Sequence, residues 1–392
     1  MSQATLKPLL IPVLCLAVLA GCSGSNDGDG RVVGHFALAE RDAPESGGIE
    51  NLSFETASTS GTTGEDGVFT FLPGETISFS IGNLEIAGDV PAAPFLTPLE
   101  IRTDQRELLF AGATDDRGLQ THRLIEEQLV RNSDVAINTM RLILVLNDEV
   151  EVEPSDTIRI TERTIEQINA YLAEQGPEFD FGQPVSSFAS PANSEFDNEG
   201  NLIDASPVNR MLNSICFAPE GDELCEEPPT LDEIENTADE EVQEELEDRR
   251  DQILTARRSL SDLDVGRVRD FLLAETRRFR LDLEEPYFLS PEALTLSPDE
   301  TGIQTVDIRR AGEGDAVLQP NAIDARALSN KLLVQAAGWQ SAEVDYFHTG
   351  ENGDSGTILI NFRIDFPEFD NYRWFRKTLR VCIQDDGSPC ST

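Results

Sequence analysis

The stretch that decides the fold of the N-terminal part reads Val68-Phe-Thr-Phe-Leu-Pro-Gly-Glu-Thr-Ile-Ser-Phe-Ser-Ile81. Apolar and polar residues alternate on both sides of Pro73-Gly74, which is typical of two short strands joined by a turn, each with one buried and one wet face. Segments 32–38 and 51–56 also read as strands. We therefore expect residues 31–110 to form a β-rich module, a small sandwich or barrel-like sheet.

Four features of this module occur together in one order. They are a Gly61-Thr-Thr turn, a Gly67-x-Phe-x-Phe71 strand, a Pro73-Gly-Glu75 turn and a Phe79-Ser-Ile-Gly82 strand. This combination resembles a β-rich module of Gram-negative bacterial lipoproteins and surface proteins, in which Tyr usually stands where this chain has Phe71. Some of those lipoproteins carry labels that link them to organic-solvent transport. The resemblance brings no catalytic residues.

Helical patterns follow the module. Apolar residues recur at helical spacing between Val135 and Leu146, with Asp134 as the expected cap, and from a Thr161 cap to a stop at Gly176-Pro177. Thr230 and Glu233 form a capping box that opens a charged segment with one narrow apolar stripe. We expect helices over about 121–175 and 230–280, with 230–256 as one solvated helix docked on its own domain. Its stripe also fits coiled-coil pairing with a partner.

Strand patterns return at the C-terminal end. In Thr357-Ile-Leu-Ile-Asn-Phe-Arg-Ile-Asp-Phe366 every second residue is apolar, which predicts one buried face. We expect antiparallel strands over about 342–384 and a helix over 322–337 lying against them. The predicted class is therefore α+β: the small module at 31–110 followed by a larger α+β domain at 120–392, with helices and a C-terminal antiparallel sheet.

The first 22 residues predict export and lipidation. A positive residue, Lys7, precedes an apolar stretch of about 13 residues, which is too short to span a bilayer of about 30 Å. Leu19-Ala-Gly-Cys22 resembles the bacterial lipobox. The resemblance implies a lipoprotein signal peptide at 1–21, several acyl chains on Cys22 and stable membrane attachment through the N-terminal lipid. Ser23 after the cysteine implies the outer membrane. Residues 22–30 read as a flexible tether.

The remaining cysteines fall into two close pairs, Cys216 with Cys225 and Cys382 with Cys390. In an exported protein, close spacing of this kind predicts two local disulfides. A zinc site is the alternative, but the spacings are long and no histidine lies near either pair.

The charge balance excludes one large class of partner. The chain has 73 acidic and 30 basic residues and a formal net charge of −43, so it repels the phosphate backbone of nucleic acids. Of the basic residues, 27 are Arg. A carboxylate-rich, Lys-poor surface is typical of proteins from salt-tolerant bacteria, with an ordinary acidic secreted protein as the alternative.

Candidate sites for chemistry are weak. Gly353-Asp-Ser-Gly356 resembles a serine-protease nucleophile segment, yet its surroundings predict a β-turn. Residues 196–203 read as a hairpin turn, in which four oxygen-bearing side chains could bind calcium although their spacing misses the EF-hand loop: Asp197, Glu199, Asn201 and Asp204. Aromatic residues gather at 346–348 and 372–375, which fits either strand packing or a ligand-binding face. No cofactor is expected.

These observations favour a lipid-anchored, non-enzymatic binding or structural protein of the cell envelope, with a partner there that the sequence does not identify. One alternative is an accessory of lipid or hydrophobic-solute transport, which would need an apolar cavity. A second is an acidic extracytoplasmic hydrolase, which would need two carboxylates about 5 to 9 Å apart.

Overall fold

The computed structural model describes residues 30–36, 48–64, 67–111, 113–149, 152–153, 156–176, 179–191, 195–284, 286–311, 322–337, 343–366 and 371–389. The predicted signal peptide 1–21, Cys22, the tether up to residue 29 and Cys390 lie outside these residues.

The described chain contains both helices and strands in quantity. The helices are α1 Thr103–Ala111, α2 Arg123–Asn132, α3 Asp134–Leu146, α4 Glu162–Gln175, α5 Val185–Phe188, α6 Pro207–Ser214, η1 Glu223–Cys225, α7 Leu231–Glu235, α8 Glu240–Ala256, η2 Leu260–Asp262 and α9 Val265–Glu284. The strands before α4 are β1 Val32–Phe36, β2 Ile49–Glu50, β3 Ser53–Thr56, β4 Ser60–Thr62, β5 Val68–Phe71, β6 Thr76–Ile81, β7 Leu84–Pro91, β8 Phe95–Leu96, β9 Ala113–Thr114, β10 Gln120–Thr121 and β11 Ile158–Arg159. The strands after α9 are β12 Tyr287–Ser290, β13 Ala293–Leu296, β14 Gln304–Arg310, β15 Ala322–Ala327, β16 Leu332–Ala337, β17 Glu343–His348, β18 Ser355–Phe366 and β19 Asn371–Ile383. The predicted α+β class is confirmed.

The N-terminal module is a small β-sandwich. One sheet has the strand order β4-β3-β6-β7 and the other β5-β1-β8. Alternate residues of the strands point inward, so that the ring of Phe79 lies 4.4 Å from that of Phe36 and 5.3 Å from that of Phe69, between ring centroids. The alternation at 68–81 therefore predicted the buried faces correctly.

The sandwich does not have a core of its own. Its buried side chains belong to one continuous cluster with those of α3, α4, α6 and the first part of α9. Helix α3 is the centre of this cluster, since every residue from Ala136 to Leu146 is buried. We call this unit, up to Leu273, the N-terminal body. Its extent differs from the division expected between residues 110 and 120, because the helices cover the apolar surface that the module leaves open.

The C-terminal part is a second β-sandwich, which we call the C-terminal sandwich (residues 287–383). Its two sheets have the orders β12-β14-β17-β16 and β13-β19-β18-β15. Tyr287 of one sheet packs against Phe362 and Phe375 of the other, with ring centroids 5.5 and 5.2 Å apart. Ile358, Ile360 and Phe362 face this core as predicted. The sheets cover each other, whereas the sequence had predicted that helices would cover a single sheet.

The prediction of a helix over residues 322–337 is wrong. Residues 322–327 form β15 and residues 332–337 form β16, which are edge strands of different sheets. Each pairs with a long neighbour, β15 with β18 and β16 with β17. The alanines and leucines of this segment favour a helix locally, but pairing with two strands already in place outweighs that propensity.

Two details of the helices also differ from expectation. Ser133 caps α3 by accepting a hydrogen bond from Ala136 N, and Asp134 is the first helical residue. The segment 230–256 is two helices, because Asn236 ends α7 and Asp239 caps α8. The Thr230–Glu233 capping box, the Thr161 cap and the left-handed stop at Gly176 are confirmed.

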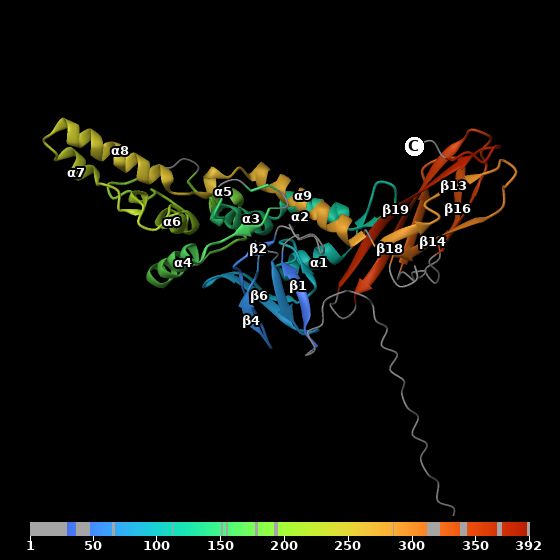
Figure 1. Ribbon diagram of the computed structural model, residues 1–392, viewed down its shortest axis with the longest axis horizontal. Coiled ribbons are helices and arrows are strands. Elements are labelled where there is room, and N and C mark those ends of the chain that lie inside the picture. Colours follow the sequence, from blue (N-terminus) through green and yellow to red (C-terminus); the bar gives the residue numbers. More distant parts are fainter. Residues whose placement is uncertain are drawn as a thin grey trace, which may run out of the picture.

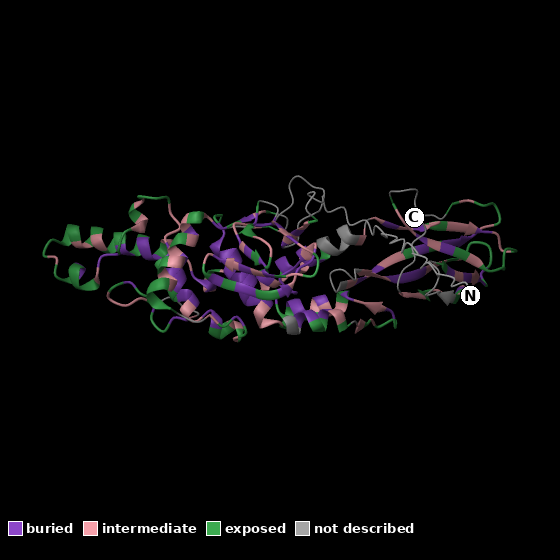
Figure 2. Ribbon diagram, turned by 90° about the horizontal axis from the view of Figure 1, so that it is seen from below, coloured by how far each residue is buried: buried purple, intermediate pink, exposed green. Residues whose placement is uncertain are grey.

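The molecule is elongated (Figure 1). Helices α7 and α8 project at one end, the C-terminal sandwich lies at the other, and α9 runs along the middle toward that sandwich. Figure 2 shows the projecting end coloured mostly as exposed and the buried residues gathered in the central part of the N-terminal body and inside the C-terminal sandwich. Among the described residues, no helix combines the length and the apolar character needed to cross a bilayer.

Candidate functional site

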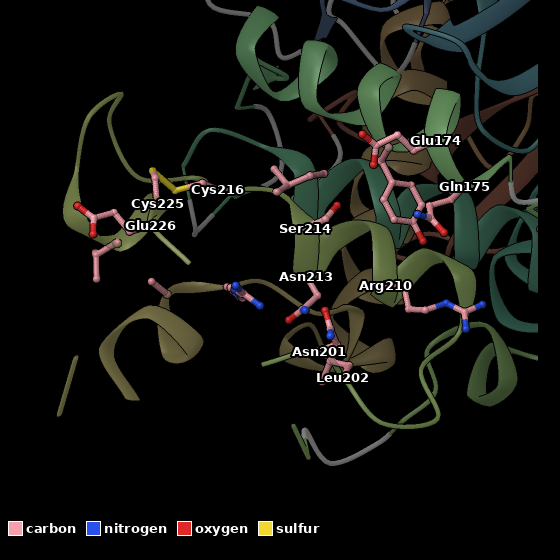
Figure 3. A pocket seen from close by; sticks show the side chains of 15 residues that line it. Glu174, Gln175, Asn201, Leu202, Arg210, Asn213, Ser214, Cys216, Cys225 and Glu226 are labelled. Atoms are coloured by element: carbon pink, nitrogen blue, oxygen red, sulfur yellow. A yellow bond between two sulfur atoms is a disulfide. The ribbon is translucent and has the colours of Figure 1, made fainter. Parts of the chain in front are cut away.

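A pocket of about 400 Å³ opens in the helical part of the N-terminal body. Five elements surround it: the C-terminal end of α4, the hairpin 196–202, α6, the loop between Cys216 and Cys225, and the end of α8. In Figure 3 the disulfide closes one side, while Glu174, Gln175 and Arg210 lie toward the opposite side. The volume is within the usual range for small-molecule pockets.

The loop between Cys216 and Cys225 is closed by the predicted disulfide, with the two Cα atoms 5.3 Å apart. Two residues of helix α4, one turn apart, form hydrogen bonds with this loop. Gln167 accepts from Cys216 N at 2.8 Å and donates to Cys216 O at 3.2 Å, and Arg163 donates to Ala218 O. The disulfide wall is therefore held at a defined position against α4.

The hairpin wall is held by the guanidinium groups of α8. Arg250, which is almost fully buried, donates to the carbonyl oxygens of Asn198 and Pro229 at 2.9 and 2.6 Å. Arg257, which directly follows α8 as its C-cap residue, donates to Gly200 O at 2.7 Å. Gly200 itself has a φ of +84°, and a Cβ there would lie 2.6 Å from the ring of Pro228. This close approach requires glycine.

The floor of the pocket is apolar and its rim is polar. Leu202 and Ile215 are buried beneath it, and Asn213 donates to Gly200 O at 3.3 Å. Asn201, Ser214 and Gln175 line the pocket with exposed hydrogen-bonding groups. Such a lining suits a small polar solute with an apolar face.

Two arginines bring positive charge to the pocket. Arg210 is exposed on α6, and Arg257 is half-buried at the end of α8. Burial and then the neighbouring Arg250 lower the pKa of Arg257 from its usual range, although a guanidinium stays cationic in proteins. The carboxylate of Glu226 on the rim is ion-paired with Arg249. The two pocket arginines are thus not neutralised by Glu226.

The four calcium candidates lie in and beside this hairpin but do not form a cation site. Asp197 Oδ1 accepts from Asn201 N at 2.7 Å, and Arg250 takes the main-chain oxygens of the turn. Glu199 and Asp204 are not brought together with Asp197, and no cluster of His, Cys, Asp or Glu in the described part of the chain could hold a metal. The hairpin turn itself is confirmed by pairing of Phe196 with Leu202.

The other predicted residues lie in the C-terminal sandwich, away from the pocket. Cys382 is buried on β19, and its predicted pairing with Cys390 stays a prediction. Of the aromatic residues, Tyr346 and Phe375 are core side chains, and burial raises the pKa of Tyr346 to about 12. The predicted turn is formed by residues 351–354, in which Asp354 N donates to Glu351 O and Asp354 pairs with Lys331 at 3.1 Å, while Ser355 and Gly356 begin β18.

Sequence reasoning missed the pocket, because the local signal at its arginines is weak. Of the 27 arginines, 15 have an acid three or four residues away, such as Glu127 for Arg123. Neither Arg210 nor Arg257 has one at those spacings. Ten other arginines share this property, so the spacing alone does not locate the pocket.

No protein-family model matches the chain, and neither does any curated protein or solved structure with which it was compared. The function proposed below is therefore inferred from the residues and their geometry alone.

Proposed function

We propose that this chain is a lipid-anchored protein of the bacterial cell envelope that acts as a non-enzymatic binding module, with the pocket beside the Cys216–Cys225 disulfide as its ligand site. The observation that carries the proposal is this pocket, one wall of which is closed by a disulfide. A disulfide is typical of proteins that fold outside the cytoplasm, which agrees with the export signal and lipobox of the sequence.

The geometry of the pocket favours a polar ligand over a lipid. Its rim carries two guanidinium groups, amides and hydroxyls, and its apolar residues form only part of the surface. An accessory of lipid transport would need an apolar cavity deep enough to cover acyl chains. We therefore place this protein among binders of small polar solutes.

Lipid attachment would keep the pocket close to the membrane. With a net charge of −43 the chain cannot adhere to anionic lipid through its surface, so acylation of Cys22 would supply the anchor. The same acidic surface suits a saline exterior, where salt screens the repulsion between carboxylates. The Ser23 that follows the cysteine favours the outer membrane.

The anchor has a direct test. Cells expressing the full chain are labelled with a radioactive fatty acid and fractionated, in parallel with Cys22→Ala and Cys15→Ala. We expect label and membrane recovery for the unchanged chain and for Cys15→Ala, whose substitution lies inside the predicted signal, and loss of both for Cys22→Ala. Label that persists in Cys22→Ala, or an unchanged chain without label, contradicts the proposal.

A further inference from the structure

The pocket holds two guanidinium groups that have no carboxylate partner among the described residues. Arg210 makes no side-chain hydrogen bond or ion pair there, and Arg257 donates to the carbonyl oxygen of Gly200 at 2.7 Å. Elsewhere in the chain arginines do find carboxylates: Arg376 lies 2.6 Å from Asp115 and Arg123 lies 2.8 Å from Glu127.

The position of these two guanidinium groups on one pocket is what makes them informative. Arg250 and Arg258 also donate to main-chain carbonyl oxygens, but Arg210 and Arg257 differ from them in lining the pocket. Guanidinium groups bind carboxylates through charge-assisted, often bidentate hydrogen bonds. Two of them on one pocket form a recognition site for an anionic group.

The rest of the lining indicates what accompanies that anionic group. Asn201, Gln175 and Ser214 offer donors and acceptors, and Glu174 at the end of α4 can accept from a hydroxyl. Leu202 and Ile215 beneath them offer an apolar surface to a ring face. A volume of about 400 Å³ accommodates one or two rings of this kind.

We propose that this pocket binds a sugar acid, a small hydroxylated ring that carries one carboxylate, and that Arg210 and Arg257 recognise the carboxylate. This inference rests on the proposed function only in taking the pocket as the ligand site. It does not depend on the lipid anchor.

The binding test compares a charged and a neutral sugar. The purified full chain in detergent is titrated calorimetrically with D-galacturonate and D-glucuronate, and with D-galactose and D-glucose, at one ionic strength. We expect saturable binding of at least one uronate, at least about tenfold tighter than its neutral counterpart, since charge-assisted hydrogen bonds are lost with the carboxylate. No saturation by either uronate up to about 50 mM overturns the inference.

The variants assign the binding to the arginines. Arg210→Gln leaves the fold intact, since this side chain has no described partner, and weakens uronate binding by about tenfold. The matched control Arg123→Gln removes the same charge from an exposed position of α2, away from the pocket, and leaves the affinity unchanged. Equal affinities in the two variants overturn the assignment. Equal binding of uronate and neutral sugar overturns recognition of the carboxylate while leaving the pocket as a ligand site.

Discussion

At the scale of single residues, His122 is the most perturbed titratable group for which the structure sets a value. Its ring is 1% exposed and lies between Phe110 and Tyr372, and its Nε2 faces Tyr372 O at 3.1 Å. Burial, and then the positive charge of Arg373, lower the pKa of His122 from 6.5 to about 3. The imidazole is therefore neutral in the folded protein across the whole physiological range.

The shift predicts how stability responds to pH. Between the unfolded pKa of 6.5 and the folded pKa of about 3, the unfolded chain binds more protons than the folded one, so the free energy of unfolding falls as the pH decreases through this window. Because of this histidine, the free energy of unfolding at pH 5 is about 2 kcal/mol lower than at pH 7. Urea unfolding at pH 7 and pH 5 should show that the free energy of unfolding decreases clearly less for His122→Gln than for the unchanged chain. Identical losses would contradict the predicted role of the histidine.

At the scale of elements, the pocket depends on a short loop that has little packing of its own. Residues 216–225 have only the 3₁₀ turn η1 as regular structure, and no residue of η1 is buried. The disulfide and the contacts from α4 hold the loop in place. The wall of the pocket is thus set by covalent and polar constraints more than by apolar burial.

Removing the disulfide should therefore affect both stability and binding. For a loop this short, the double substitution Cys216→Ser/Cys225→Ser is expected to lower the free energy of unfolding by about 2–3 kcal/mol. Urea unfolding measures the loss, and the same calorimetric titration measures weaker uronate binding in the still-folded variant. A free energy of unfolding that does not change would show that α4 alone holds the loop.

At the scale of the whole molecule, charged side chains join the two bodies. Glu100 of the N-terminal body is completely buried, and its Oε1 lies 2.8 Å from Nη2 of Arg373 on β19. Arg373 and Arg106 both lie over the ring of Phe110, at 4.9 and 4.7 Å from its centroid. The apolar cores of the two bodies are separate, so this junction joins them together with other polar contacts, such as the ion pair of Arg376 with Asp115.

The junction predicts a strong and asymmetric mutational effect. Arg373→Met leaves the buried Glu100 with the hydrogen bonds from Thr97 and with Arg106 at 4.0 Å as its remaining ion-pair partner among the described residues, and should lower the free energy of unfolding by about 3 kcal/mol. The double variant Glu100→Gln/Arg373→Met removes both charges and should recover most of the loss. Calorimetry should resolve two transitions in the single variant, because the bodies then unfold separately. The control Arg309→Gln breaks a half-exposed pair with Asp307 and should cost less than about 1 kcal/mol.

Local patterns were sufficient for much of the fold. The Thr161 cap, the Gly176 stop, the Thr230–Glu233 capping box and the alternation at 358–362 depend on residues within a few positions of one another, and all are confirmed. The Cys216–Cys225 bridge belongs with them, since it spans nine positions. The break between α7 and α8 was equally local, and Asn236 and Asp239 were the residues that marked it.

Sequence alone was thus sufficient for the α+β class, the longer helices, the strands at 32–36, 53–56, 68–81 and 343–383, and one disulfide, because neighbours along the chain decide caps, turns and buried faces. Tertiary structure alone decided the rest. Residues 322–337 are strands because two distant strands pair with them. The N-terminal module shares its core with helices far along the chain. The pocket arginines, Arg210 and Arg257, are 47 positions apart. Only folding brings such residues together, since their meeting depends on packing between elements that no local pattern records.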